Sequence, residues 1–133
     1  MLMSYGFLAK IFALFDKYQT PIDLISTSEV SVALTIDHSD HLKMLIEELS
    51  EYGEVETLSN VAIISVVGSQ FRAQSGIAGR VFNALADTNI LMISGGASDI
   101  NLSFVLADNQ ADRAVQQLHA EFFRSNTKHP PCA

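Results

Sequence analysis

Two residues near the start of the chain could do chemistry together: Gly6, at the N-terminus of a predicted helix, and Asp23, early in a predicted strand. A helix N-terminus offers unpaired backbone N–H donors to an anion, and a carboxylate offers a partner to a cation. In a compact arrangement we expect the Gly6 loop to lie beside the start of that strand. The two residues then predict a site for a zwitterion, which means a free amino acid. The alternative is that Asp23 is a solvated strand-end carboxylate and that Gly6 serves only the conformation of the helix entry.

The elements that must position these residues are a helix over 7–18 and two strands over 22–27 and 30–37. The two strands are joined at Thr27-Ser28-Glu29, which is either part of the site or a plain turn. Apolar residues at helical spacing predict a wide buried face on the helix, made of Phe7, Leu8, Ile11, Phe12, Leu14 and Phe15.

The chain repeats this unit about 70 residues further on. Gly6-Phe7 falls on Gly76-Ile77, and Ser28-Glu29-Val30 falls on Ser98-Asp99-Ile100. The position that matches Asp23 holds Leu91, so the pattern favours one amino-acid site per chain, in the first copy. A weaker second pocket at Ser98, Asn101 and the Gly95-Gly96 turn stays open as an alternative.

The remaining elements follow the same order in both copies. A helix over 40–52, which Ser39 or Asp40 can cap, and a short strand over 54–58 complete the first copy. In the helices the residues expected to face the core are Leu42, Leu45, Ile46, Leu49, Ile77, Val81, Phe82, Leu85, Ala111, Ala114, Val115 and Leu118. The second copy has strands over 61–67, 90–94 and 100–106 and helices over 76–87 and 110–122.

Each copy runs helix, strand, strand, helix, and with a leading and a closing strand it becomes βαββαβ, the ferredoxin-like pattern of the α+β class. We expect two domains, 1–59 and 60–124, and a flexible tail over 125–133. Two complete units need eight strands, whereas the sequence predicts about six. The sheets therefore keep open edges, which upstream strands or a partner chain would complete.

Composition excludes several classes of function. The net charge is −7 and the Lys and Arg residues are scattered, which argues against nucleic acid and against an anionic membrane surface. No apolar run approaches the roughly 18 residues that span a bilayer, and the sequence start lacks signal-peptide features. The single cysteine, Cys132, allows no intrachain disulfide and fits a cytoplasmic location. The four histidines form no metal pattern, and no catalytic constellation is present, so we expect no cofactor and no catalysis by this chain itself.

At this point the motifs are specific enough to indicate a family. Gly6-Phe7-Leu8-Ala9 and the run from Ile22 to Leu34 closely resemble the first ACT domain of aspartate kinase, in its lysine-sensitive, monofunctional branch. The segments 76–82 and 94–104 resemble the second ACT domain of the same family. The resemblance covers residues 1–124, and its most specific part is Thr27-Ser28-Glu29-Val30-Ser31-Val32.

The resemblance implies a regulatory module that gives end-product feedback inhibition of an aspartate kinase, whose catalytic domain lies N-terminal to the ACT pair and is absent here. It also implies a homodimer through the ACT domains, with the effector amino acid, expected to be L-lysine, bound between the first domains. A segment upstream of the pair would complete the second sheet. The family's effector positions fall on Met1, Ser4, Gly6, Phe7, Ile22, Asp23, Thr27, Ser28 and Glu29.

This chain departs from the family pattern at two of these places. Ile22 replaces the more usual Val, and Pro21 stands where many members have Ser, which removes any polar contact from that side chain. Threonine and methionine therefore remain alternative ligands. Two other functions remain open, a dimerisation module without its own effector site and a small ferredoxin-like enzyme of the acylphosphatase type.

Overall fold

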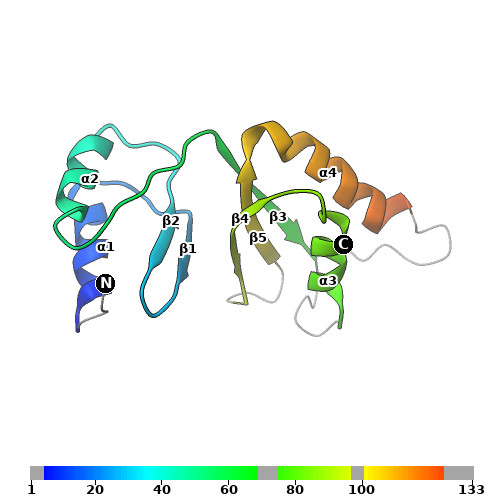
Figure 1. Cartoon of the computed structure of the whole chain (residues 1–133), viewed down its shortest axis with the longest axis horizontal. Helices are drawn as coiled ribbons and strands as arrows, with labels where there is room; N and C mark the ends of the chain where they lie inside the picture. The colour runs from blue at the N-terminus through cyan, green and yellow to red at the C-terminus, as the bar shows by residue number, and fades with distance from the viewer. Residues whose placement is uncertain (1–4, 69–74, 97–100, 125–133) are drawn as a thin grey trace. The chain divides into compact units, whose positions relative to one another are not determined.

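The computed structural model describes residues 5–68, 75–96 and 101–124. The chain divides into two compact units, Met1–Thr57 and Leu58–Ala133 (Figure 1). The predicted tail over 125–133 lies outside the described residues. Within the described part of the chain, no helix has the length and apolar character needed to cross a bilayer.

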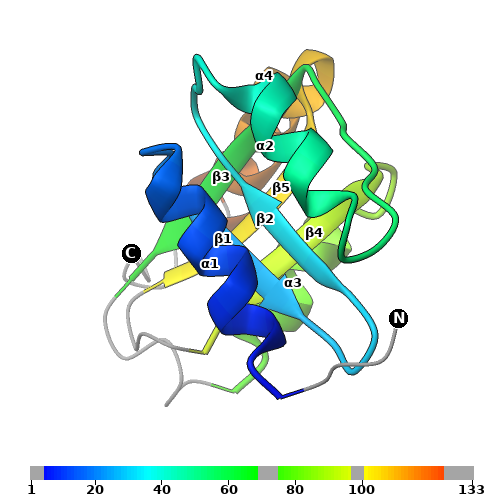
Figure 2. The ribbon, with the colours of Figure 1, turned by 90° about the vertical axis from the view of Figure 1, so that its left-hand side faces the viewer.

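The first unit is a hairpin covered by two helices. Its strands β1 (Leu24–Thr27) and β2 (Val32–Thr35) pair antiparallel. Helices α1 (Phe7–Lys17) and α2 (Leu42–Leu49) both lie on one face of the hairpin (Figures 1 and 2). The fully buried core between them is small and consists of Phe7, Ile11, Phe15 and Leu45.

Helix α1 forms because its apolar residues recur at helical spacing, and it ends in a defined backbone motif. The N–H of Thr20 bonds to the carbonyl of Phe15, and the N–H of Gln19 bonds to the carbonyl of Asp16. Gln19 adopts a left-handed conformation with φ 49°. These features make a Schellman motif, in which a glutamine occupies the position that usually holds glycine.

An ion pair joins the two helices of the first unit. The Nζ of Lys17 on α1 lies 2.8 Å from Oε1 of Glu48 on α2. The hydrogen bond from Lys17 lowers the pKa of the Glu48 carboxyl, and Tyr18 contributes in the same direction. The same hydrogen bond raises the pKa of Lys17.

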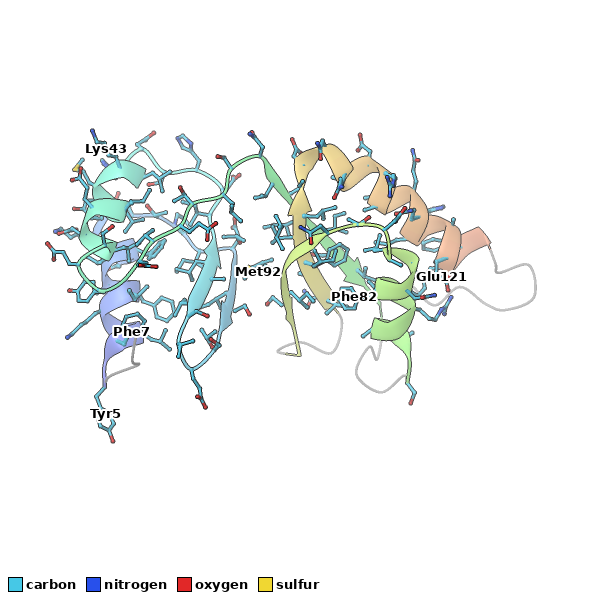
Figure 3. The ribbon with its side chains drawn as sticks, viewed as in Figure 1. Tyr5, Phe7, Lys43, Phe82, Met92 and Glu121 are labelled. Carbon is cyan, nitrogen blue, oxygen red and sulfur yellow. The ribbon has the colours of Figure 1, made fainter. Side chains whose placement is uncertain are left out.

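The second unit is a three-stranded antiparallel sheet that consists of β3 (Val61–Val67), β4 (Ile90–Gly95) and β5 (Asn101–Ala107). The strand order in the sheet is β3-β5-β4. Its helices α3 (Ile77–Ala84) and α4 (Ala111–His119) lie on one face of that sheet (Figure 1). On Figure 3, Phe82 points from α3 toward the sheet, whereas Met92 points away from its other face. The 3-10 turn η1 (Asp108–Gln110) precedes α4, and the π-helical turn η2 (Ala120–Arg124) follows it.

Arg80 on α3 holds the turn that follows α4, an arrangement we call the Arg80 clamp. Its Nε donates to Oε1 of Glu121 at 3.1 Å, and its Nη2 donates to the Glu121 carbonyl at 3.2 Å. The guanidinium also lies 4.4 Å from the centre of the Phe122 ring. The clamp fixes η2 against α3 at the edge of the core.

The predicted fold class is confirmed. Both units are α+β, and the second follows the ferredoxin-like order with strands β3, β4 and β5 and helices α3 and α4. The sheets of the described residues are also incomplete, with two strands in one unit and three in the other. The repeat extends to the backbone, because Gly6 and Gly76 both precede their helices in the left-handed conformation, at φ 76° and 81°.

Several local predictions are wrong. Residues 54–58 form no strand, because Val55 is exposed between two glutamates and has no partner strand. The second helix spans only Leu42–Leu49 instead of 40–52, and His41 precedes it without a side-chain cap. The predicted helix over 110–122 is three short segments, η1, α4 and η2.

Three residues predicted to face the core are exposed. Phe12 is 38% exposed, Leu42 is 40% exposed and Val115 is 50% exposed. Each lies at the border of its helix's apolar stripe, where spacing alone does not say how wide the covering sheet is. In this fold the sheets are narrow, and only the centre of each stripe is buried.

Candidate functional site

Asp23 is the residue immediately before β1 and lies outside the regular pairing of the hairpin. Its N–H donates to the carbonyl of Thr35 at 2.8 Å, and the next N–H, of Leu24, donates to the Thr35 hydroxyl at 2.9 Å. The amides of two consecutive residues therefore both bond to Thr35, as in a β-bulge, and the regular pairing of β1 with β2 begins at Leu24. We call this arrangement the bulge. The bulge lets Ile22 pack against the core while Asp23 remains exposed.

The second unit has the same irregularity at the equivalent place. The pairing of β4 with β5 shifts between Ile90, opposite Leu106, and Met92, opposite Val105, so Leu91 is the extra residue. Ile90 packs against the core, as Ile22 does, and Leu91 is 41% exposed. The two units thus present different chemistry at one structural position, a carboxylate in the first and an apolar side chain in the second.

Gly6 and Phe7 form the N-terminal end of α1. Gly6 is exposed, and its carbonyl accepts the N–H of Lys10 at 3.0 Å as the first bond of the helix. Phe7 is 7% exposed and belongs to the core, so it supports the site and does not project from it. Figure 3 shows Tyr5 pointing away from the unit just before this end of the helix.

The expected juxtaposition of Gly6 with Asp23 does not occur within one unit. The chain runs the length of α1, about 16 Å for 11 residues, before it turns back through Tyr18–Asp23 into β1. In Figures 1 and 2 the start of α1 lies at the end of the hairpin that carries the turn between β1 and β2, and the start of β1 lies at the other end. The prediction placed the start of the helix beside the start of the strand, whereas this connection makes the helix and the strand run in opposite directions.

The turn after β1 holds itself together with its own hydroxyl groups. The N–H of Ser28 donates to the Ser31 carbonyl at 2.9 Å, the two serine hydroxyls lie 2.8 Å apart, and Val30 N–H reaches the Ser28 hydroxyl at 3.3 Å. Thr27 ends β1, and Thr27, Ser28 and Glu29 are all exposed at this end of the unit. They lie at the same end as Gly6. Their carbonyl, hydroxyl and carboxylate oxygens could accept hydrogen bonds from a ligand ammonium group.

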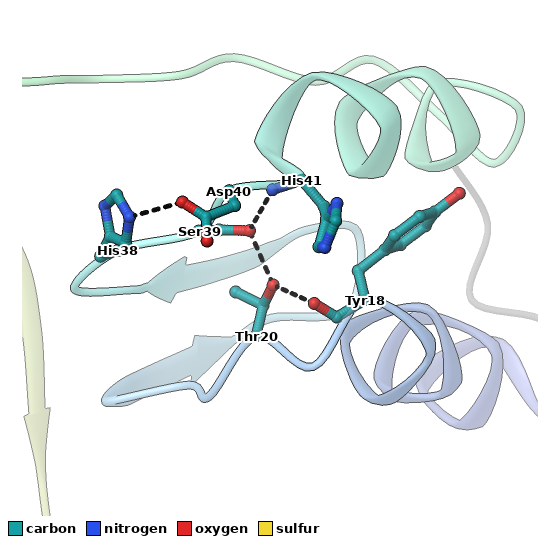
Figure 4. A network of polar contacts seen from close by, with 6 residues as sticks. All are labelled: Tyr18, Thr20, His38, Ser39, Asp40 and His41. Carbon is teal, nitrogen blue, oxygen red and sulfur yellow. Dashed lines mark hydrogen bonds and ion pairs between the residues drawn. The ribbon is translucent and has the colours of Figure 1, made fainter.

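A buried hydroxyl lies between α1 and the bulge. Thr20 is 4% exposed, and its Oγ1 lies 2.8 Å from the hydroxyl of Ser39, just before α2 (Figure 4). Neither Thr20 nor Thr35 was predicted as part of the site. The sequence carries one signal for Thr20, because a threonine also stands three residues before Leu91, at Thr88.

The described residues thus divide the predicted site into two groups at opposite ends of the first unit. One group is Gly6, Phe7, Thr27, Ser28 and Glu29, and the other is Ile22 and Asp23. Met1 and Ser4 lie outside the described residues. Among residues 5–68, 75–96 and 101–124, no group of three or more His, Cys, Asp or Glu side chains could hold a metal ion.

Comparison with known proteins gives consistent matches. Residues 64–122 match the ACT domain family. The chain is 44% identical over 130 residues to aspartate kinase FUB3 of Gibberella fujikuroi, a match that covers 93% of this chain and 26% of that protein. The chain therefore spans about a quarter of the length of such curated relatives.

Solved structures of an aspartokinase also match this chain. Aspartokinase III of E. coli superposes with a TM-score of 0.85 at 39% identity in its complex with aspartate and ADP, described as the R-state. In its complex with lysine and aspartate, described as the T-state, the values are 0.80 and 40%, with 92% of this chain and 29% of that chain covered.

A shorter solved structure matches over most of its own length. It is assigned as a C-terminal regulatory domain of aspartate kinase from Porphyromonas gingivalis W83, is 35% identical with a TM-score of 0.82, and is covered to 84%, together with 92% of this chain. The two units described above thus correspond to most of the length of that regulatory domain. The chain belongs to the family of C-terminal regulatory ACT domains of aspartate kinase.

Proposed function

We propose that this chain binds L-lysine and gives end-product feedback inhibition of the aspartate kinase to which it belongs. The observation that carries the proposal is the exposed carboxylate of Asp23, which the bulge holds out from the first unit only. A carboxylate suits the side-chain ammonium of lysine, and a charge-assisted hydrogen bond to it contributes about 1.5–3 kcal/mol.

The ligand choice is supported by the likeness to E. coli aspartokinase III, which has been solved with lysine. Threonine and methionine carry no cationic side chain, so neither would use Asp23 in this way. In the second unit the equivalent position is Leu91, which offers no partner to an ammonium group. The proposal therefore assigns the lysine site to the first unit.

The two ends of the site would come from two protomers. One first unit separates Gly6 from Asp23 by the length of α1, so a single amino acid does not reach both. Around a two-fold axis, side-by-side antiparallel association brings the Gly6 end of one protomer to the Asp23 end of its partner. A homodimer then has two equivalent sites, each with helix N–H donors for the ligand carboxylate and Asp23 for its side chain.

Inhibition follows if lysine binds better to one dimer arrangement than to another. The arrangement that joins the two ends would be the one that holds the kinase domain of the parent chain inactive. Because the ligand shifts the population only by its differential affinity for the two states, dimer formation and lysine binding must be coupled. On this proposal the module works in the cytoplasm, with a free amino acid as its only small-molecule partner.

Calorimetric titration of the chain with L-lysine, L-threonine and L-methionine tests the proposal. We expect saturable lysine binding, weakened about tenfold to a hundredfold in Asp23→Asn, which removes the charge and keeps the shape. Asp16→Asn is the matched control, because Asp16 is another exposed aspartate of the same unit. Sedimentation of the same samples should show a larger dimer fraction with lysine.

The alternative is a dimerisation module without its own effector site, which the incomplete sheets favour. It predicts dimers whose stability no amino acid changes. An absence of heat with all three amino acids, with dimers still present, would establish this alternative and overturn the lysine proposal.

A further inference from the structure

A directed chain of hydrogen bonds crosses the first unit next to the bulge. The Thr20 hydroxyl has one proton, which it donates to the Tyr18 carbonyl at 3.1 Å. The 2.8 Å bond between Thr20 and Ser39 must then use the Ser39 proton, and the Ser39 oxygen accepts the N–H of His41 at 3.2 Å. Figure 4 shows this path from the start of α2 to the end of α1. Both hydroxyl groups are used as donor and acceptor, so neither is replaceable by an apolar group without leaving a partner unsatisfied.

Thr20 is therefore anchored twice, by its backbone to α1 and by its side chain to the segment before α2. Its N–H bonds to the Phe15 carbonyl at 2.9 Å. Only Pro21 and Ile22 separate it from Asp23; Pro21 has a fixed φ, and Ile22 packs on the core. On the other side, Thr35 holds the amides of Asp23 and Leu24. The Asp23 backbone is thus fixed from both directions.

Gln19, the residue before Thr20, has a backbone conformation that its residue type disfavours, so the anchor holds this segment against a local conformational preference. Gln19 is held at φ 49°, a conformation that residues with a side chain rarely adopt. Such a conformation persists where surrounding contacts over-determine it. The Thr20 bonds to Phe15, Tyr18 and Ser39 are the contacts next to it in the chain.

We propose that Thr20, acting through Ser39, is a positioning residue that aims Asp23 at the side-chain ammonium of the bound amino acid. It touches no ligand itself. Its role is to decide how strongly the site prefers a cationic side chain over an apolar one of the same length. This inference rests on the proposed lysine site and names a determinant of its specificity.

The test compares L-lysine with L-norleucine, which has the same carbon chain without the terminal ammonium. Thr20→Val keeps the shape of the side chain and removes the hydroxyl, and Thr20→Ser restores it. Thr20→Val removes the hydroxyl's bonds to Tyr18 and Ser39. We expect it to weaken lysine binding about two- to tenfold, the size of one net hydrogen bond at the ligand, with little change for norleucine. Ser39→Ala should act in the same direction, and Thr20→Ser should recover the lysine preference.

Thr88→Val is the matched control, because Thr88 stands three residues before Leu91 as Thr20 stands before Asp23, and it is also partly buried. It should leave both affinities unchanged. A Thr20→Val variant that weakens lysine and norleucine equally would show a merely structural role and overturn the inference, as would an unchanged preference for lysine. If the unsubstituted chain binds no amino acid, the proposed function fails and the inference fails with it. If the chain binds lysine but the preference does not depend on Thr20, only the inference fails.

Discussion

The first unit should lose most of its stability when one leucine of α2 is shortened. Leu45 is 1% exposed and is the only residue of α2 among the four fully buried core residues of that unit. A Leu→Ala change at such a site costs about 3–5 kcal/mol, since the lost transfer free energy adds to the cost of a cavity. A unit the size of Met1–Thr57 has a free energy of unfolding of only about 3–9 kcal/mol. We therefore expect Leu45→Ala to unfold a large fraction of the first unit at 25 °C.

The control is Leu42→Ala in the same helix. Leu42 is 40% exposed and is not part of the buried cluster, so its truncation should cost about 1 kcal/mol or less. Both variants replace a leucine of α2 with alanine, so the change in residue type and in helix propensity is the same. The two variants therefore differ in how deeply the replaced leucine is buried.

Hydrogen exchange followed by mass spectrometry is the suitable assay, because it reports each unit by its own peptides. In Leu45→Ala, peptides from α1, β1 and β2 should lose protection, whereas those from β3, α3 and β5 should keep it. Equal loss in the Leu45 and Leu42 variants would refute the assignment of the core. Loss of protection also in peptides of the second unit would refute the expectation that the change acts within the first unit alone.

Three further predictions concern single side chains that affect the stability of one of the two units. Replacing Gln19 by glycine should raise the melting temperature, with a gain of about 0.5–1 kcal/mol, because relief of the left-handed strain exceeds the added chain entropy. Arg80→Lys should lower the stability of the second unit by about 0.5–1 kcal/mol, measured by chemical denaturation, since lysine has neither the planar fork nor the ring contact of the clamp. Because the hydrogen bond from Lys17 lowers the folded-state pKa of Glu48, that carboxylate stabilises the fold above its unfolded pKa of about 4.3. This stabilisation is lost as the pH falls through the lower folded-state pKa. Glu48→Gln should therefore make the melting temperature fall less steeply with decreasing pH below about pH 5.

The sequence predicted the repeat and the elements whose patterns are long and regular. The strand over 61–67 has the predicted bounds, since an unbroken apolar run between polar residues leaves little choice. The strand over 54–58 had only Val55 as an apolar centre and did not form. Phe12 shows the complementary error, because helical spacing indicates a stripe but not the width of the surface that covers it.

The site was predicted in residue types but not in geometry. Asp23 was selected because a carboxylate is unusual in an apolar strand, and the structure explains its exposure by a bulge that no local pattern announced. The bulge depends on Thr35, twelve residues away in the partner strand, so it is a tertiary feature. The same holds for the separation of Gly6 from Asp23, which follows from the direction of one connection.

The two bulges also explain why one fold position can carry function in one unit and not in the other. In each unit the residue before the bulge, Ile22 or Ile90, is fixed by the core, and its neighbour is thereby turned outward. The fold constrains the first residue and leaves the identity of the second free. Asp23 and Leu91 can therefore differ without any change in packing, and the chemistry of the ligand can be set at this position independently of stability. An exchange of these two residues should then leave both units folded. The preference for a cationic ligand should move from the first unit to the second, together with the carboxylate.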